Sequence, residues 1–291
     1  MALTEVHLGS APRASTLAED VRLGLVGANK RLASKWLLQA RDADTFGQII
    51  ALPEYYLTRR ERAILWTFGS EIPRLAHATT LIELQPRCAE LSSKLRELVH
   101  PATQISINTS LHDAVAEIPD DDHRIVTALG NSIGELEPDA RVEFLTSLAM
   151  TLRSGEHLLL TADLVKDPER LVAACDDRQG VIADLNLGLL ERMNRELGAR
   201  FPRNRFRHVA RWDPEVEQVE LLLRSMQDQL VPIPGADIVA SFERGEEFRT
   251  AIHATFRRER LTSEVRACGF DPIAWWTDPA GDVSLSLWSR V

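Results

Sequence analysis

Residues 80–98 constrain the fold of this chain more than any other stretch of the sequence. An apolar run at 81–84 is typical of a buried strand, and Leu91, Leu95 and Leu98 follow it at helical spacing. A strand, a tight turn and a helix form the place where α/β folds bind nucleotides. The turn here, QPRCA at 85–89, contains no glycine, although glycine normally allows sharp turning and close approach to a ligand. The sequence therefore predicts a nucleotide-binding architecture with an altered turn.

Composition excludes several classes of function. A net charge of −9 disfavours a general nucleic-acid binder, because such proteins present basic surfaces. The apolar runs are shorter than the roughly 18 residues of a membrane span, and residues 1–15 lack the apolar core of a signal peptide. Cys88, Cys175 and Cys268 are scattered, which favours a reducing compartment without disulfides or a metal site. We therefore expect a cytoplasmic protein that binds neither nucleic acid nor membrane.

Buried strands alternate with amphipathic helices in the first half of the chain. The predicted strands share an apolar character and lie at 80–84, 105–108, 124–129 and 156–162. This alternation favours an α/β fold with a parallel sheet covered by helices. After Pro168 the pattern changes to a long helical stretch and to alternating strands at 217–225 and 237–243. A helix at 256–268 and strands at 270–276 and 283–288 are predicted to close the chain.

Four segments, in order along the chain, resemble the histidine-specific, S-adenosylmethionine-dependent Nα-methyltransferases of ergothioneine biosynthesis. The segments are LPEYYLTR at 52–59, LG and IG within 129–134, TADLVKD at 161–167 and WWTDPAGD at 275–282. The resemblance implies a Rossmann-like methyltransferase core and a second, α+β substrate-binding lobe. We assign the core to 61–167 plus 256–291 and the substrate-binding lobe to 10–60 plus 168–255.

The cofactor motifs of that family are altered here. The family turn resembles ELGSGT, whereas this chain has Glu83 and Leu84 followed by QPRC. Residues 85–123 have room for about one unit of roughly 30 residues, so we expect a core shortened by one βα unit. No Asp or Glu occurs between Glu97 and Asp113, where the resemblance implies a carboxylate for the cofactor ribose.

These departures predict no cofactor. The expected protein is then a pseudoenzyme subunit, or a repurposed cofactor-independent enzyme that acts on an amino-acid-like substrate. Natural-product biosynthesis is one setting for such a protein. The alternative is an active S-adenosylmethionine-dependent N-methyltransferase of an amino acid or amine.

The resemblance also implies an amino-acid pocket whose residues are partly replaced. Glu135 stands in place of an asparagine at the end of a buried strand, where it could hold an amine or act as a base. The alternative is a surface glutamate at a helix start. His253 is the other catalytic candidate, although an isolated histidine can be structural. Cys175, in place of a tyrosine, is either a small buried filler or a nucleophile.

The predicted substrate-binding residues are Tyr55, Tyr56, Asn131, Glu135 and Cys175. The two tyrosines either line a pocket or simply pack. No metal ligands are predicted.

Residues 200–211 carry five arginines and no acidic residue. Arg203, Arg205 and Arg207 could bind an acidic protein or an anionic substrate, because arginine binds carboxylates bidentately. The alternative is a solvated face. A shortened sheet also leaves an unpaired edge, and such edges tend to be covered. We therefore expect an oligomer, either with a second copy or with an acidic protein.

Overall fold

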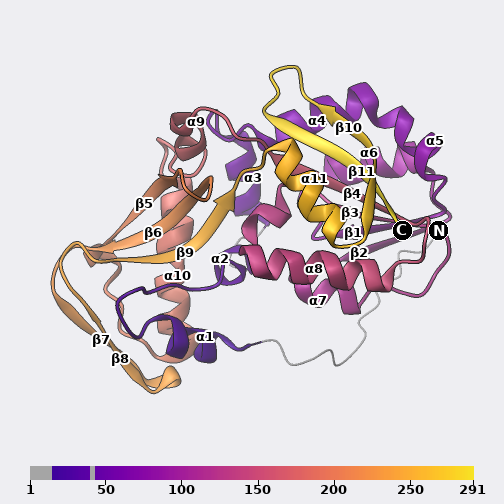
Figure 1. The fold of residues 1–291 in the computed structure, drawn as a ribbon. Helices are drawn as coiled ribbons and strands as arrows, with labels where there is room; N and C mark the ends of the chain where they lie inside the picture. The colour runs from indigo at the N-terminus through magenta and orange to yellow at the C-terminus, as the bar shows by residue number, and fades with distance from the viewer. Residues whose placement is uncertain (1–14, 40–42) are drawn as a thin grey trace. The chain divides into compact units, whose positions relative to one another are not determined.

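The computed structural model describes residues 15–39 and 43–291 (Figure 1). Contacts divide the chain into two compact units. The first unit contains Leu57–Val165 and Thr255–Val291, and the second contains the described residues up to Tyr56 together with Lys166–Ala254.

The first unit is built on a six-stranded sheet with the order β10-β11-β4-β3-β1-β2. Its strands are β1 (Thr80–Leu84), β2 (Thr103–Ile107), β3 (Arg124–Ala128), β4 (His157–Asp163), β10 (Phe270–Thr277) and β11 (Val283–Arg290). The first four are parallel, and β11 runs antiparallel to both β4 and β10. Ile82 of β1 lies beside Ile105 of β2 and Val126 of β3. The predicted α/β class with a parallel core is confirmed.

Helices lie on both faces of this sheet (Figure 1). They are α4 (Leu57–Phe68), α5 (Ile72–Ala76), α6 (Ala89–Val99), α7 (Leu111–Ala116), α8 (Pro138–Thr151) and α11 (Arg258–Ala267). Between β1 and β3 the chain forms one strand, β2, flanked by α6 and α7, as the length of this stretch predicts. β2 lies at the sheet edge, and of its residues only Ile107 is buried.

The helical stretch before β1 is interrupted. A 3₁₀ turn, η1 (Gly69–Glu71), separates α4 from α5. A Cβ on Gly69 would lie 2.4 Å from Cδ1 of Leu98, so a larger residue here would require the Leu98 side chain of α6 to move. Pro73 then occupies the first turn of α5, where its missing N–H costs no helical hydrogen bond.

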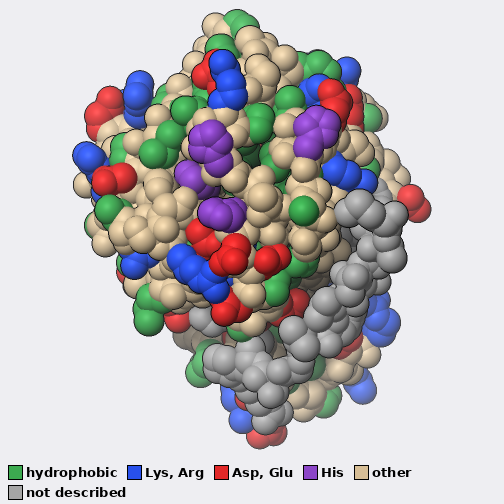
Figure 2. Space-filling model, turned by 90° about the vertical axis from the view of Figure 1, so that its right-hand side faces the viewer, with side chains coloured by type: hydrophobic (Ala, Val, Ile, Leu, Met, Phe, Trp, Pro, Cys, Tyr) green, Lys and Arg blue, Asp and Glu red, His purple; other side chains and the backbone are tan. Residues whose placement is uncertain are grey.

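Histidines mark the amino ends of the four parallel strands. His77 and His100 end the helices before β1 and β2, His123 directly precedes β3, and His157 begins β4. Figure 2 shows histidine side chains gathered on one face of the molecule beside a group of acidic side chains. Burial lowers the pKa of His157, and the neighbouring His77 adds to this effect. This amino edge is opposite the carboxyl edge, where α/β sheets bind ligands.

The second unit has two small antiparallel sheets. One has the order β5-β6-β9, and the other is the hairpin β7-β8. The strands are β5 (Phe206–Asp213), β6 (Gln218–Ser225), β7 (Gln229–Ile233), β8 (Ile238–Phe242) and β9 (Glu247–Ala254). The helices are α1 (Leu17–Gly24), α2 (Lys35–Gln39), α3 (Ala43–Ala51), α9 (Pro168–Ala173) and α10 (Val181–Leu197). Two further 3₁₀ turns are η3 (Arg203–Arg205) and η4 (Pro234–Ala236).

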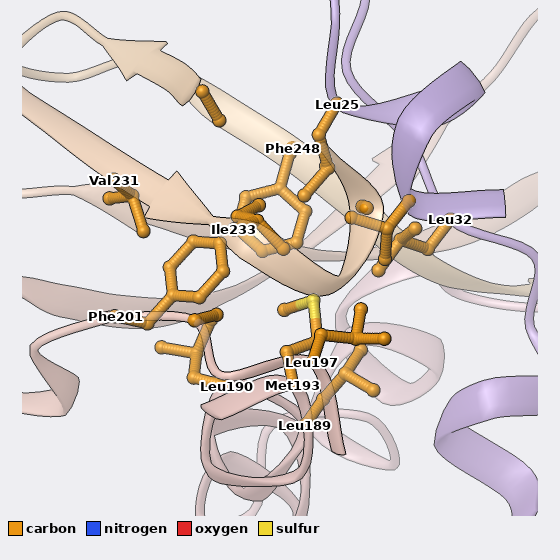
Figure 3. Close-up of a cluster of buried hydrophobic side chains, with 14 of the residues drawn as sticks. Leu25, Leu32, Leu189, Leu190, Met193, Leu197, Phe201, Val231, Ile233 and Phe248 are labelled. Atoms are coloured by element: carbon orange, nitrogen blue, oxygen red, sulfur yellow. The ribbon is translucent and has the colours of Figure 1, made fainter. Parts of the chain in front are cut away.

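The core of this second unit lies between α10 and the strands (Figure 3). Leu189 and Met193 of α10 are fully buried and face Phe248 of β9. Phe206, Phe242 and Phe248 pack with ring centroids 5.3 to 6.0 Å apart, a spacing at which aromatic pairs attract. The sequence analysis predicted β6 and β8 but not β5, β7 and β9.

Candidate functional site

The strand order places a topological switch point between β1 and β3. The chain leaves β1 for β2 on one side and then continues to β3 on the other side. Ligands of open α/β sheets bind outside the carboxyl ends of strands at such a point. The turns that follow β1 and β3 there, residues 85–88 and 129–135, contain the candidate site.

The turn after β1 forms without glycine. Gln85 has a φ of 49°, in the left-handed region that favours glycine. Its N–H donates to the carbonyl of Ile107 at 2.8 Å, and its Nε2 donates to the carbonyl of Thr109 at 2.7 Å. These bonds hold Gln85 against the carboxyl end of β2. The expectation that a sharp turn here needs glycine is therefore wrong, because Gln85 adopts a left-handed conformation and is fixed there by hydrogen bonds.

An ion pair spans the switch point. Arg87 Nη1 lies 2.6 Å from Glu135 Oε1, and Arg87 Nη2 lies 2.5 Å from Glu135 Oε2. The same guanidinium donates to Gln85 Oε1 at 3.1 Å. The side chains are only 18% and 10% exposed. Such a two-pronged geometry is among the strongest between side chains, so the ends of β1 and β3 are linked by charge as well as by the sheet.

Arg87 also lies at the amino end of α6. Cys88 is the residue before this helix, and its side chain makes no capping hydrogen bond. The first N–H groups of a helix and its dipole favour an anion. A guanidinium beside this helix end therefore provides a setting that fits a carboxylate.

The turn after β3 holds Asn131, which is 1% exposed. Its Oδ1 accepts a hydrogen bond from the N–H of Asp163 at 3.0 Å, and its own N–H donates to Oγ1 of Thr161 at 3.3 Å. Both bonds join the turn to β4. The predicted role of Asn131 in substrate binding stays a prediction, and the structure shows a role in holding the turn.

Glu61 of α4 was not singled out by the sequence analysis. It is 2% exposed, and its Oε1 accepts from the N–H of Gly130 at 2.5 Å and from Oγ1 of Thr161 at 2.6 Å. Burial raises the pKa of Glu61, and the bonds from Thr161 and Gly130 oppose this effect. The sequence contained one signal for a buried Glu61, because this residue falls on the apolar face of α4 with the buried Leu57 and Leu65.

Tyr55 and Tyr56 belong to the second unit, just before α4. Tyr56 is buried, and its hydroxyl accepts a hydrogen bond from Lys166 Nζ at 3.0 Å. The charged groups of Lys166 and Arg170 lie 4.6 and 5.4 Å from the centre of its ring. Tyr55 is half-buried. The structure thus places two cationic side chains beside the ring of Tyr56.

Cys175 is 6% exposed and takes part in a buried network through its backbone. Its carbonyl lies 3.0 Å from Nε2 of His208, and Nδ1 of His208 lies 2.8 Å from Nδ2 of Asn186. Because a carbonyl can only accept, Nε2 of His208 carries the hydrogen and Nδ1 accepts. Burial lowers the pKa of His208, whereas the Cys175 carbonyl opposes this effect. This network holds the segment between α9 and α10.

His253, the second catalytic candidate, lies in β9 opposite Val219 of β6 and is half-buried. It belongs to the second unit, whereas Glu135 and Asn131 belong to the first. Of the predicted site residues, Glu135 and Asn131 lie in one turn of the first unit, and His253 lies in the other unit. The catalytic role of His253 stays a prediction.

The arginine-rich run forms η3 and β5. Arg203 pairs with Asp184 at 2.7 Å and with Glu191 at 2.6 Å, so its charge is neutralised within the chain. Arg205 and Arg207 are exposed. A role of these arginines in partner binding stays a prediction.

Two further properties bear on the site. In the part of the chain that the structure describes, no three His, Cys, Asp or Glu side chains are arranged to hold a metal ion. Among the helices of residues 15–39 and 43–291, none has the length and apolar character needed to cross a bilayer.

Comparison with known proteins identifies related chains. Residues 17–86 and 84–290 match the family described as histidine-specific methyltransferase, SAM-dependent. Histidine N-alpha-methyltransferase of Mycolicibacterium smegmatis is 38% identical over 311 residues, which cover 97% of both chains. The protein of the same name from Mycobacterium tuberculosis is 36% identical with the same coverage. A solved structure of a Burkholderia thailandensis N1-methyltransferase matches with a TM-score of 0.40 at 10% identity, covering 90% of this chain and 93% of that one.

These matches overturn the expectation of no cofactor. The matched family is S-adenosylmethionine-dependent, and the two matched stretches together include the altered turn at 85–88. The sequence analysis inferred the loss of the cofactor from the missing glycines, from the absence of a carboxylate between Glu97 and Asp113, and from the shortened core. The structure shows that Gln85 supplies that conformation and that Arg87 adds a cationic group beside it.

Proposed function

Because the chain belongs to the family of histidine-specific, S-adenosylmethionine-dependent methyltransferases, we propose that it is an active N-methyltransferase that uses S-adenosylmethionine to methylate the amine of an amino acid. The observation that carries the proposal is the match of both mycobacterial relatives over 97% of their length and of this chain. The names of those relatives give histidine as their substrate, and on that basis we propose an amino acid as the substrate of this chain.

The switch point fits the charged end of the cofactor. S-adenosylmethionine ends in an α-amino acid group with one carboxylate. In the proposed complex this carboxylate binds to Arg87 and to the uncapped amino end of α6. A guanidinium has five N–H donors, so Arg87 can bind the ligand and keep its bonds to Glu135. Asp113 of α7, the helix that follows β2, accepts from Ser110 Oγ at 2.5 Å and is the proposed carboxylate for the cofactor hydroxyl groups.

The bound cofactor supplies the methyl group from its sulfonium centre. The chain must then present a neutral amine, because a protonated nitrogen has no lone pair for the transfer. Glu135 is the proposed amine-binding group and base: its carboxylate binds the substrate ammonium, accepts the proton that the ammonium must lose, and orients the neutral nitrogen. Arg87 meanwhile binds the carboxylate of the cofactor.

Methyl transfer to a panel of amino acids tests this proposal. The purified full chain is incubated with S-adenosylmethionine and single amino acids, including histidine, and products are detected by mass spectrometry. We expect N-methylated product from at least one amino acid and its loss in Glu135→Ala. A matched control is Glu137→Ala, two residues away at the start of α8. A wild-type chain that transfers no methyl group to any member of the panel would contradict the proposal.

A further inference from the structure

Glu61 is a buried carboxyl group outside the proposed ligand contacts. It comes from α4, whereas the groups it contacts come from the turn after β3 and from β4. Its Oε1 accepts from the N–H of Gly130 at 2.5 Å and from Oγ1 of Thr161 at 2.6 Å. One oxygen thus joins three elements of the first unit.

The turn that Glu61 holds has a costly backbone conformation. Gly130 and the next residue, Asn131, both have left-handed φ values, 73° and 54°. Residues other than glycine rarely adopt this region, and they remain there when the surroundings fix them. The bond from Gly130 to Glu61 and the bond from Asn131 to Thr161 provide that constraint. Glu135 follows four residues later and meets Arg87 at the switch point.

We propose that Glu61 is a positioning residue, which keeps the Gly130–Asn131 turn left-handed and so places Glu135 against Arg87. This inference rests on the proposed function for its effect on ligand binding. Its effect on the turn itself is independent of that function.

Burial raises the pKa of Glu61, so its carboxyl stays neutral over a wider pH range than an exposed glutamate. A neutral carboxyl and a carboxamide have the same shape, and each offers an oxygen that can accept both bonds. Glu61→Gln should therefore preserve the turn. Glu61→Leu has a similar size but removes the acceptor.

Two measurements on the full-length chain test the inference. Hydrogen exchange followed by mass spectrometry reports the protection of peptides covering 129–136, without any ligand. Calorimetric titration with S-adenosylhomocysteine reports the affinity of the site. The variants are Glu61→Leu, Glu61→Gln and the milder Thr161→Val. The matched control is Arg62→Gln, an exposed position on the same helix.

We expect faster exchange of 129–136 and at least about tenfold weaker binding in Glu61→Leu, a smaller change of the same kind in Thr161→Val, and wild-type values in Glu61→Gln and Arg62→Gln. If Glu61→Leu does not fold, Thr161→Val decides. Unchanged exchange at 129–136 in the folded variants would overturn the inference. A wild-type chain that binds no S-adenosylhomocysteine, with exchange changed as expected, would contradict the proposed function and leave the positioning role supported.

Discussion

Replacing Arg87 with glutamine is expected to weaken ligand binding more than it weakens the fold. Glutamine retains some hydrogen bonding but removes the charge that faces Glu135 and the proposed cofactor carboxylate. Loss of a hydrogen bond between charged groups costs about 1.5–3 kcal/mol. Since about 1.4 kcal/mol corresponds to a tenfold change, the dissociation constant should rise roughly 10- to 150-fold.

The effect of this substitution on stability should be smaller. Removing one partner of a fully buried ion pair costs about 3–5 kcal/mol. Arg87 and Glu135 are 18% and 10% exposed, so water reaches the pair and screens the charge that is left unpaired. We therefore expect the free energy of unfolding to fall by about 1–2 kcal/mol.

Calorimetric titration with S-adenosylhomocysteine and chemical unfolding measure the two effects separately. Glu135→Gln is the matched control, because it alters the same pair but leaves the proposed carboxylate-binding group in place. It should keep most of the affinity and lose methyl transfer. The exchanged double variant, Arg87→Glu with Glu135→Arg, should recover stability without recovering binding. Wild-type affinity in Arg87→Gln would refute the assignment.

Three further outcomes are expected. Because burial raises the pKa of Glu61 in the folded chain, its stabilising contribution is lost as pH rises through that pKa. Chemical unfolding should therefore show the free energy of unfolding of Glu61→Gln increasing relative to that of wild type as pH rises. Burial opposes ionisation of Glu156, but hydrogen bonds from Arg124 and from nearby backbone lower its pKa below the usual value. The stabilisation that ionised Glu156 gives the folded chain is therefore lost as pH falls. Glu156→Gln should cost about 3–5 kcal/mol in neutral buffer and progressively less in acid, measured by chemical unfolding. Changing both Arg205 and Arg207 to Glu should alter stability by less than about 0.5 kcal/mol but weaken any association seen by light scattering; a wild-type chain that scatters as a monomer would contradict self-association.

The core sheet could be predicted from the sequence because its strands are continuous apolar runs. β1, β3 and β4 are buried along their whole length, so their residues carry a signal that needs no knowledge of neighbours. β5 gave a weaker signal. Buried Phe206 and His208 alternate there with exposed arginines. The sequence analysis interpreted the arginines as a charged surface and did not predict a strand. β9 likewise mixes buried residues with the partly exposed Glu247, Arg249 and His253, and a bulge interrupts its alternation.

The site was harder to predict because its contacts are distant in sequence. Arg87 and Glu135 were considered separately, and nothing local indicates that the ends of β1 and β3 bring them within 2.6 Å. The left-handed backbone of Gln85 also has no sequence signal, because it depends on bonds to the end of β2. Glu61 alone had a local signal, as a carboxyl group on an apolar helix face.

The most direct test of the proposed cofactor site is a crystal structure of the full chain with S-adenosylhomocysteine bound. The measured quantity is the distance from the ligand carboxylate to the guanidinium of Arg87. The proposal predicts an ordered ligand at the carboxyl ends of β1 and β3, with that distance near about 3 Å, the range of a charged hydrogen bond. A ligand ordered elsewhere, or crystals that show none at saturating concentration, would contradict it.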